Sequence, residues 1–318
     1  MVEDTKKATK NYFIGWDVGT WKCTNGNKKS CDAIVILDDR KILGHCRENI
    51  SESIASAHSL KERKSYSLMI DWFRKCKTGI IPSESDAFYI AIDTPLGWPR
   101  GFRSLLEGQL ANDWSFQLQE PDLKNKLLFR HTEQTLNSGF SVVTHSIGNQ
   151  STKGMVLLRA LNSTQIGWGV WKEGNTTLLE TYPKACLRSK SFVEWILTHD
   201  NTYDLREWSN AGSKKRRKPW LKEQDDTFDA GICAYLAKAF HSSNPELVQP
   251  AQIQDAPISE GWIFYPRGEL VNSNLADGHA DKTNSVLANT FAEALVAFQK
   301  HVLANEALGR RQEDIADE

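Results

Sequence analysis

The sequence predicts an α/β fold built on a mixed sheet, in which three antiparallel strands come first and parallel strands follow. Three strand-like runs, at residues 12–20, 31–37 and 42–48, succeed one another across short polar turns, as in an antiparallel meander. Residues 66–77 then have the apolar density of a helix. A fourth strand-like run, at residues 88–95, follows that helix. A helical crossover returns a chain to a sheet in the parallel direction.

The first predicted strand carries a single carboxylate, Asp17, inside the apolar and aromatic run YFIGWDVGT. An unpaired carboxylate in apolar surroundings costs several kcal/mol, so a buried strand rarely contains one. Two explanations remain open at this point. Asp17 either closes an Asx-type turn on Gly19 or lies against a cation.

The fourth predicted strand repeats this design, because the run FYIAID ends on Asp93 and is followed by Pro95 and Gly97. Two strands of one sheet that each deliver a carboxylate near their end are typical of a metal site. The repetition favours the cation over the local turn.

The rest of the chain gives alternating helix and strand signals. Residues 97–154 form a long, partly helical connection, which we interpret as an insertion between the fourth strand and the later strands. Helices are predicted at residues 151–161, 191–199 and 220–240, and strands at 177–182 and 261–266, with weak alternation over 165–171. We expect a disordered tail at 1–11, one domain at 12–270, and a C-terminal helical extension and tail at 271–318.

Composition restricts the class of protein. The chain has 318 residues, 40% of them hydrophobic, and a net charge of −1, so any nucleic-acid surface must be a local patch. No apolar run approaches the roughly 18 residues of a membrane span. The first ten residues lack the apolar core of a signal peptide. Six cysteines without a Cys-x-x-Cys pair predict reduced thiols, and together these features predict a cytoplasmic protein.

A third carboxylate is predicted at the start of the helix over residues 220–240. Asp225 and Asp226 are explained by helix capping, because acidic residues are favourable in a first turn. Asp229 is explained less well by capping, since it lies on the small-residue face that continues through Ala230 and Cys233.

These carboxylates predict a hard-cation site. Asp17, Asp93 and Asp229 are the expected ligands of Mg²⁺ or Mn²⁺, and Asp226 approaches the same site from the rim as a further catalytic candidate. Two such ions would clamp the attacking and leaving oxygens in phosphodiester hydrolysis.

The strand order and these motifs resemble the ribonuclease H-like superfamily and, more narrowly, its predicted nucleases of the domain of unknown function 429 family. The resemblance spans residues 12–266 and is carried by GWDVG at 15–19, AIDTPLGWP at 91–99, RHTE at 130–133, ETYPKA at 180–185 and DTFDA at 226–230. The chain departs from the family at Glu133, where Asp is more frequent, and in a basic insertion at 214–218. The resemblance implies a ribonuclease H-like sheet flanked by helices and a metal-dependent nuclease, a hydrolase acting on DNA or RNA with Mg²⁺ or Mn²⁺.

Two further sets of residues are candidates for the site. Glu180 ends an apolar strand, and is either a fourth acidic ligand with a catalytic role or a partner of Arg130. Arg130 is itself a candidate phosphate contact, because guanidinium binds phosphate bidentately. The basic run is either a solvated loop or a nucleic-acid contact assisted by the neighbouring Trp220; its members are Lys214, Lys215, Arg216, Arg217 and Lys218. His131 and His145 are interpreted as ordinary polar residues.

Two other functions compete with the nuclease. The segment at 17–20 also resembles the first phosphate-binding turn of ATP-dependent kinases of the actin/hexokinase-like superfamily, although a second glycine-rich loop and an adenosine motif are missing. The other alternative is a nucleic-acid-binding module whose site is inactive. Metal binding without turnover would favour that module, and ATP binding would favour the kinase.

Overall fold

The structure is a computed structural model that describes residues 9–21, 31–109, 125–136, 141–143, 147–186, 188–199, 221–244, 246–248 and 258–267. The predicted C-terminal extension and all but residues 9–11 of the predicted N-terminal tail lie outside these ranges.

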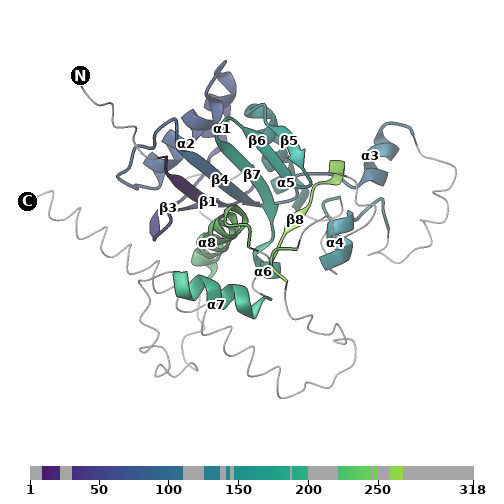
Figure 1. Ribbon diagram of the computed structural model, residues 1–318. Coiled ribbons are helices and arrows are strands. Elements are labelled where there is room, and N and C mark those ends of the chain that lie inside the picture. The colour runs from purple at the N-terminus through teal and green to yellow at the C-terminus, as the bar shows by residue number, and fades with distance from the viewer. Residues whose placement is uncertain are drawn as a thin grey trace, which may run out of the picture.

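The first half of the chain forms the predicted meander and crossover. β1 (Asn11–Asp17), β2 (Asp32–Leu37) and β3 (Ile42–Glu48) pair antiparallel, and β4 (Ala87–Asp93) lies parallel to β1 on its other side. β7 (Thr176–Thr181) continues the sheet parallel to β4. The strand order β3-β2-β1-β4-β7-β6-β5 is the ribonuclease H-like topology, and this prediction of the fold is confirmed (Figure 1).

The far edge of the sheet is a hairpin of β5 (Thr164–Gly167) and β6 (Val170–Glu173), antiparallel to each other and to β7. The sequence showed only weak alternation here, because each strand has just four residues. β8 (Ile263–Phe264) pairs with Glu180 and Thr181, the last two residues of β7. The pairing of β6 with β7 stops one residue earlier, at Leu179. Gly169 in the hairpin turn has φ +63°, and a Cβ there would lie 2.2 Å from the Trp262 carbonyl oxygen. The turn therefore requires glycine.

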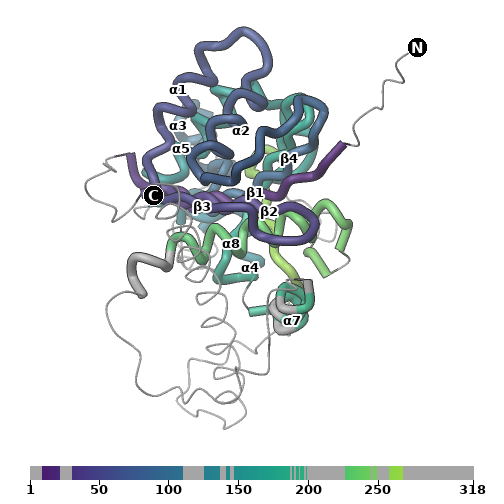
Figure 2. Tube along the Cα trace, turned by 90° about the vertical axis from the view of Figure 1, so that its left-hand side faces the viewer, coloured from purple at the N-terminus to yellow at the C-terminus, as the bar shows by residue number. Residues whose placement is uncertain are grey.

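Helices cover both faces of the sheet, and strand alternation decides which side chains each face receives. On one face lie α1 (Ser51–Ser59), α2 (Lys64–Lys75) and α5 (Ile147–Ala160), and on the other lie α7 (Lys190–His199) and α8 (Leu221–His241) (Figure 2). Along β1, Tyr12, Ile14 and Trp16 pack in the core under α2 and α5, whereas Phe13 packs against α8. We call these the α5 face and the α8 face.

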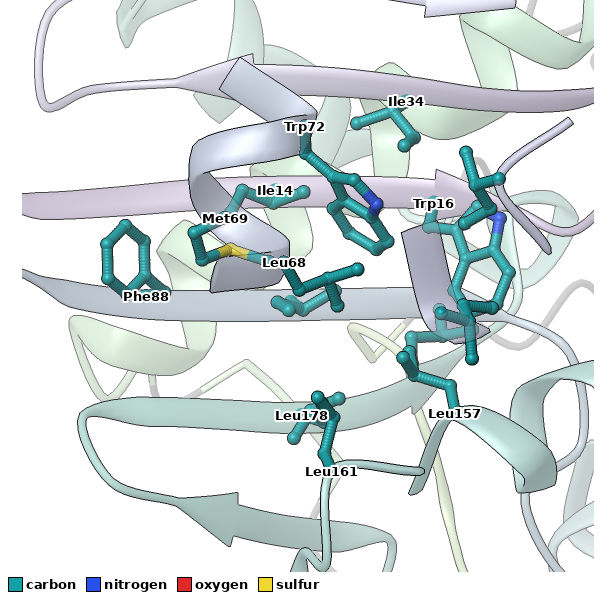
Figure 3. Packing of buried hydrophobic residues seen from close by; sticks show 14 of the residues in the cluster. Ile14, Trp16, Ile34, Leu68, Met69, Trp72, Phe88, Leu157, Leu161 and Leu178 are labelled. Carbon is teal, nitrogen blue, oxygen red and sulfur yellow. The ribbon is translucent and has the colours of Figure 1, made fainter. Parts of the chain in front are cut away.

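The core of the α5 face is rich in aromatic and branched side chains, as Figure 3 shows around Trp16, Trp72 and Met69. Trp16 and Trp72 meet edge to face with ring centroids 5.8 Å apart. α1 was not predicted from the sequence, because it buries only Ser53, Ile54 and Ala57 and has no apolar periodicity to reveal it.

The α8 face depends on small residues, as its sequence predicted. Ala230, Cys233 and Ala234 are fully buried against the sheet. A Cβ on Gly15 of β1 would lie 1.7 Å from the Ala230 carbonyl oxygen and 2.5 Å from the Ala234 nitrogen. Main chain therefore packs on main chain, and only glycine fits at this point of β1.

Shorter helices occupy the connections. The connection between β4 and β7 contains α3 (Arg100–Leu106), α4 (His131–Leu136), α5 and the β5–β6 hairpin. The predicted insertion at 97–154 covers α3, α4 and the first half of α5. After β7 comes α6 (Pro183–Cys186), and η4 (Ile258–Glu260) is a 3₁₀ turn before β8.

The cysteines correct one expectation. Cys46, Cys76, Cys186 and Cys233 are buried free thiols, as predicted. Cys31 is disulfide-bonded, so the prediction that all six cysteines are reduced is wrong. Scattered spacing does not reveal a single disulfide.

None of the helices in the described ranges is long and apolar enough to cross a membrane.

Candidate carboxylate site

Asp17 and Asp93 lie side by side at the ends of two adjacent parallel strands. The register of β1 and β4 pairs them directly, and each is the last residue of its strand. Because side chains alternate along a strand, Asp17 follows Phe13 and Gly15 onto the α8 face, and Asp93 follows Tyr89 and Ala91. The predicted pairing of two strand-end carboxylates is therefore present.

α8 brings its acidic first turns to the same face. Asp229 directly precedes Ala230, whose carbonyl lies against Gly15, two residues before Asp17. Asp226 lies nearly one turn earlier and forms an ion pair with Arg47 of β3. Asp226 is thus compensated by a cationic side chain, in keeping with a position at the rim.

Burial raises the pKa of Asp17 well above its ordinary value, and the nearby charges of Asp93, Asp229, Asp226 and Asp32 raise it further. The pKa of Asp93 is raised in the same way, first by burial and then by Asp229, while Lys184 opposes the shift. Asp229 is the strongest charged influence on Asp93. We call Asp17, Asp93 and Asp229 the carboxylate site; its members repel one another when ionised.

The metal assignment remains a prediction. Within the described ranges, no group of three His, Cys, Asp or Glu side chains is arranged to hold a metal ion. The donor chemistry does suit a hard cation, because the site consists of carboxylate oxygens only. The geometry therefore supports a pair of carboxylates, Asp17 and Asp93, with Asp229 close enough to raise the pKa of both.

Arg130, predicted as a phosphate contact, lies in a second cluster, where its guanidinium binds Glu133 and Glu180. Its side chain is fully buried, and all five of its N–H donors are used. Nε donates to Glu133 at 2.8 Å, and Nη1 donates to Glu180 Oε2 at 2.9 Å and to the Glu260 carbonyl at 3.0 Å. Nη2 donates to Glu133 and, at 2.5 Å, to Glu180 Oε1. No donor remains for a phosphate. We call Arg130, Glu133, Glu180 and Glu260 the arginine cluster.

Glu180 is the partner of Arg130, which is one of the two roles that the sequence left open for it. The register pairs Glu180 with Ile92 rather than with Asp93, so its side chain belongs to the opposite, α5 face. Its Oε2 also accepts a hydrogen bond from the Leu96 amide at 2.9 Å. Burial raises the pKa of Glu180, while the charge and hydrogen bonds of Arg130 act in the opposite direction.

In the arginine cluster, the guanidinium and the carboxylates each stabilise the charged form of the other. Burial alone would lower the pKa of Arg130, but Glu133 and Glu180 together raise it above its ordinary value. His131 was interpreted as an ordinary polar residue, and it donates from its amide to Glu260 at 3.0 Å and lies 3.2 Å from the same carboxylate through Nδ1. Glu133 and Glu260 were not expected to pair with these groups, because their positions carry no periodic signal.

Asp32 and Lys153 form a fully buried ion pair that the sequence did not reveal. Asp32 begins β2 and faces α5, and its Oδ1 accepts from the Gly19 amide at 2.8 Å. The Gly19 amide therefore donates to Asp32 on β2, and not to Asp17 as an Asx-type turn would require. In the sequence, Asp32 opens a strand-like run and Lys153 is one polar residue among several in a helix, so neither position indicates the pair.

The other predicted substrate contacts lie outside the described ranges. These are Lys214, Lys215, Arg216, Arg217, Lys218 and Trp220, and the same holds for His145.

Comparison with known proteins adds no identification. No family model, curated protein or solved structure matches the chain. The resemblance to the domain of unknown function 429 family therefore stays a prediction.

Proposed function

We propose that this chain is a nuclease that hydrolyses phosphodiester bonds in DNA or RNA with the help of Mg²⁺ or Mn²⁺. The observation that carries the proposal is the pairing of Asp17 with Asp93 at the ends of β1 and β4, under the acidic first turns of α8. Both have a raised pKa because of burial and of the charges of neighbouring carboxylates. No ion pair joins either residue to a cationic side chain in the described part of the chain.

The chemistry of the residues supports this assignment. Asp17 and Asp93 would hold the cation, and Asp229 would be the third oxygen donor on the facing helix. The ion would offset their repulsion and, when bound, act as a Lewis acid toward a phosphodiester. The three carboxylates orient the reacting phosphate only through that ion, because an anion is repelled by them alone. Asp226 is already paired with Arg47, so its contribution is smaller.

The direct test is a panel of labelled DNA, RNA and hybrid substrates, incubated with Mg²⁺ or Mn²⁺ and with EDTA as the control. We expect cleavage with either ion and none in EDTA. Asp17→Asn and Asp93→Asn should each lower the rate at least a hundredfold, about 3 kcal/mol of transition-state stabilisation.

A matched carboxylate variant controls for general effects of lost charge. Asp38 lies in the turn between β2 and β3, where its Oδ1 accepts from the amides of Arg40 and Lys41, both at 2.8 Å. Asp38→Asn should leave cleavage unchanged. Cleavage that persists in EDTA, or in Asp17→Asn, would refute the proposal, and cation binding without cleavage would favour the inactive binding module.

A further inference from the structure

Asp32 uses both of its carboxylate oxygens fully. Oδ1 accepts from the Trp16 indole at 3.0 Å and from the Gly19 amide at 2.8 Å, and Oδ2 accepts from the Ile50 amide at 3.1 Å and from Lys153 Nζ. Four donors on two oxygens leave little capacity for a further partner. Although Asp32 is close enough to act on the charge of Asp17, it is therefore not a spare ligand of the carboxylate site.

Lys153 connects Asp32 to the segment that follows Asp17. Its Nζ, on α5, also lies 5.9 Å from the centroid of the Trp21 ring, as a cation over an aromatic face. The same helix binds Trp21 twice more: the Trp21 amide donates to Asn149 Oδ1 at 3.1 Å, and the indole donates to Thr152 Oγ1 at 3.0 Å. The chain from Gly19 to Trp21 is thus fixed by β2 and α5 together.

α5 also contacts the segment that follows Asp93. The Thr94 hydroxyl donates to Ser151 Oγ at 3.4 Å. A Cβ on Gly154 would lie 2.6 Å from Thr94 Cγ2 and 2.8 Å from Leu96 Cδ2, so helix and segment are in close contact. One helix therefore touches the residues that follow both paired carboxylates.

A buried ion pair is a poor way to gain stability, because desolvation of the two charges can exceed their attraction. Two apolar residues of the same volume would stabilise the core to at least the same extent as this ion pair. The hydrogen bonds of Asp32, in contrast, have no apolar substitute, since they fix the main chain at Gly19 and the indole of Trp16 on either side of Asp17.

We propose that Asp32 and Lys153 are a positioning pair, which holds the segment after Asp17 against α5 and thereby sets the affinity of the carboxylate site for a divalent cation. The cation part of this inference rests on the proposed function; the positioning of the segment does not. Groups that orient metal ligands through hydrogen bonds typically change metal affinity by about ten- to a hundredfold when removed.

The test compares Asp32→Asn, Lys153→Met and the double variant in the full chain. We measure Mn²⁺ affinity by calorimetry, the melting temperature in EDTA, and hydrogen exchange of a peptide over residues 16–21 in EDTA. Leu161→Ala is the matched control, because Leu161 is fully buried just after α5 and its loss destabilises the core without touching the pair.

Each single variant should weaken Mn²⁺ binding at least about tenfold and speed exchange at residues 16–21 about tenfold. The double variant should regain much of the melting temperature, because it leaves no unpaired buried charge, but neither the affinity nor the protection. Leu161→Ala should lower the melting temperature alone.

The inference is overturned if the double variant regains wild-type affinity and protection, or if Leu161→Ala reproduces both losses. If the wild-type chain binds no Mn²⁺, the proposed function and the cation part of this inference fall together. Hydrogen exchange at residues 16–21 then tests the positioning part by itself. Faster exchange in Asp32→Asn but not in Leu161→Ala would support the positioning role. Exchange at the same rate in these two variants would refute it.

Discussion

The carboxylate site and the arginine cluster contain the same kind of side chain in opposite electrostatic states. In the arginine cluster, buried carboxylates surround one guanidinium that donates to all of its neighbours. In the carboxylate site, no cationic side chain within the described ranges pairs with Asp17 or Asp93, and their pKa values are raised.

A single residue of strand register separates the two regions. Asp93 ends β4 on the α8 face, whereas Glu180 is paired with its neighbour Ile92 and therefore points to the α5 face. Acidic residues at the ends of adjacent strands therefore do not gather in one cluster merely because the strands are neighbours. The face decides whether a carboxylate receives a structural partner or joins others of its own charge.

The largest expected effect tests the compensated side of this comparison. Arg130→Met leaves Glu133 and Glu180 buried without their cation, which should lower the free energy of unfolding by about 3–5 kcal/mol. Chemical denaturation at neutral pH measures the loss. Arg74→Met is the control, since Arg74 is 77% exposed in its pair with Asp71 and should cost less than about 1 kcal/mol. Equal losses would remove the distinction between the two regions.

The next effect tests the uncompensated side. A divalent ion that binds the carboxylate site stabilises the folded state, by about 2.7 kcal/mol at a hundredfold excess over its dissociation constant. We expect Mn²⁺ to raise the wild-type melting temperature, and Asp229→Asn to abolish most of that rise. Asp226→Asn should retain it, because Asp226 is paired with Arg47. A full rise in the Asp229 variant would show that Asp229 is no ligand.

The pH dependence of stability sharpens the comparison further. The pKa of Asp17 and of Asp93 is raised above the ordinary 3.8, so both carboxyls stay protonated in the folded state at pH values where the unfolded chain has ionised them. Their contribution is complete below about pH 3.8 and is lost as the pH rises through the folded-state values. In EDTA, stability should therefore fall with rising pH above 3.8, by about 1.4 kcal/mol per unit of pKa shift.

Two variants check this assignment. Asp17→Asn should reduce the decline, and thermal melts across the pH range would show it. Glu260→Gln should leave the decline in place: burial acts to raise its pKa, but hydrogen bonds from His131 and Arg100 lower it below 4.5, so it acts at lower pH. A wild-type curve that rises throughout would contradict the raised pKa values.

The smallest effect concerns the rim. Asp226 and Arg47 are partly exposed, at 27% and 12%, so solvent screens their attraction. Asp226→Asn should change the free energy of unfolding by no more than about 1 kcal/mol, and should reduce nuclease turnover less than Asp229→Asn does. A larger loss of turnover than in Asp229→Asn would reverse the two roles.

Local patterns in the sequence were enough to predict β1 to β4, β7 and the Asp17–Asp93 pair, but not the β5–β6 hairpin. Strand runs and turns determine β1 to β4, and two strands that both end on Asp place these residues together once they are parallel. The small residues at Ala230, Cys233 and Ala234 likewise predicted a face for close packing. These features depend on residues near one another in the chain.

The partners of buried charges were not predictable in this way. The sequence offered Arg130 both as a phosphate contact and as a partner of Glu180, because a guanidinium suits either anion. Only the tertiary structure decides for Glu180 and adds Glu133. Lys153 appears in the sequence as one more polar helix residue, although it lies 121 positions from its partner Asp32 and is fully buried. Charge pairing across such separations leaves no periodic trace.

The contact of Gly15 with α8 limits how a large ligand reaches the carboxylate site. Because the helix main chain rests directly on the strand, no layer of side chains exists there that a rotamer change would open. Tilting α8 away from β1 would separate a packed main-chain interface, which is far more costly than moving a loop. We therefore expect a polymer to approach along the sheet plane, past the ends of β1 and β4, while α8 keeps its position against β1.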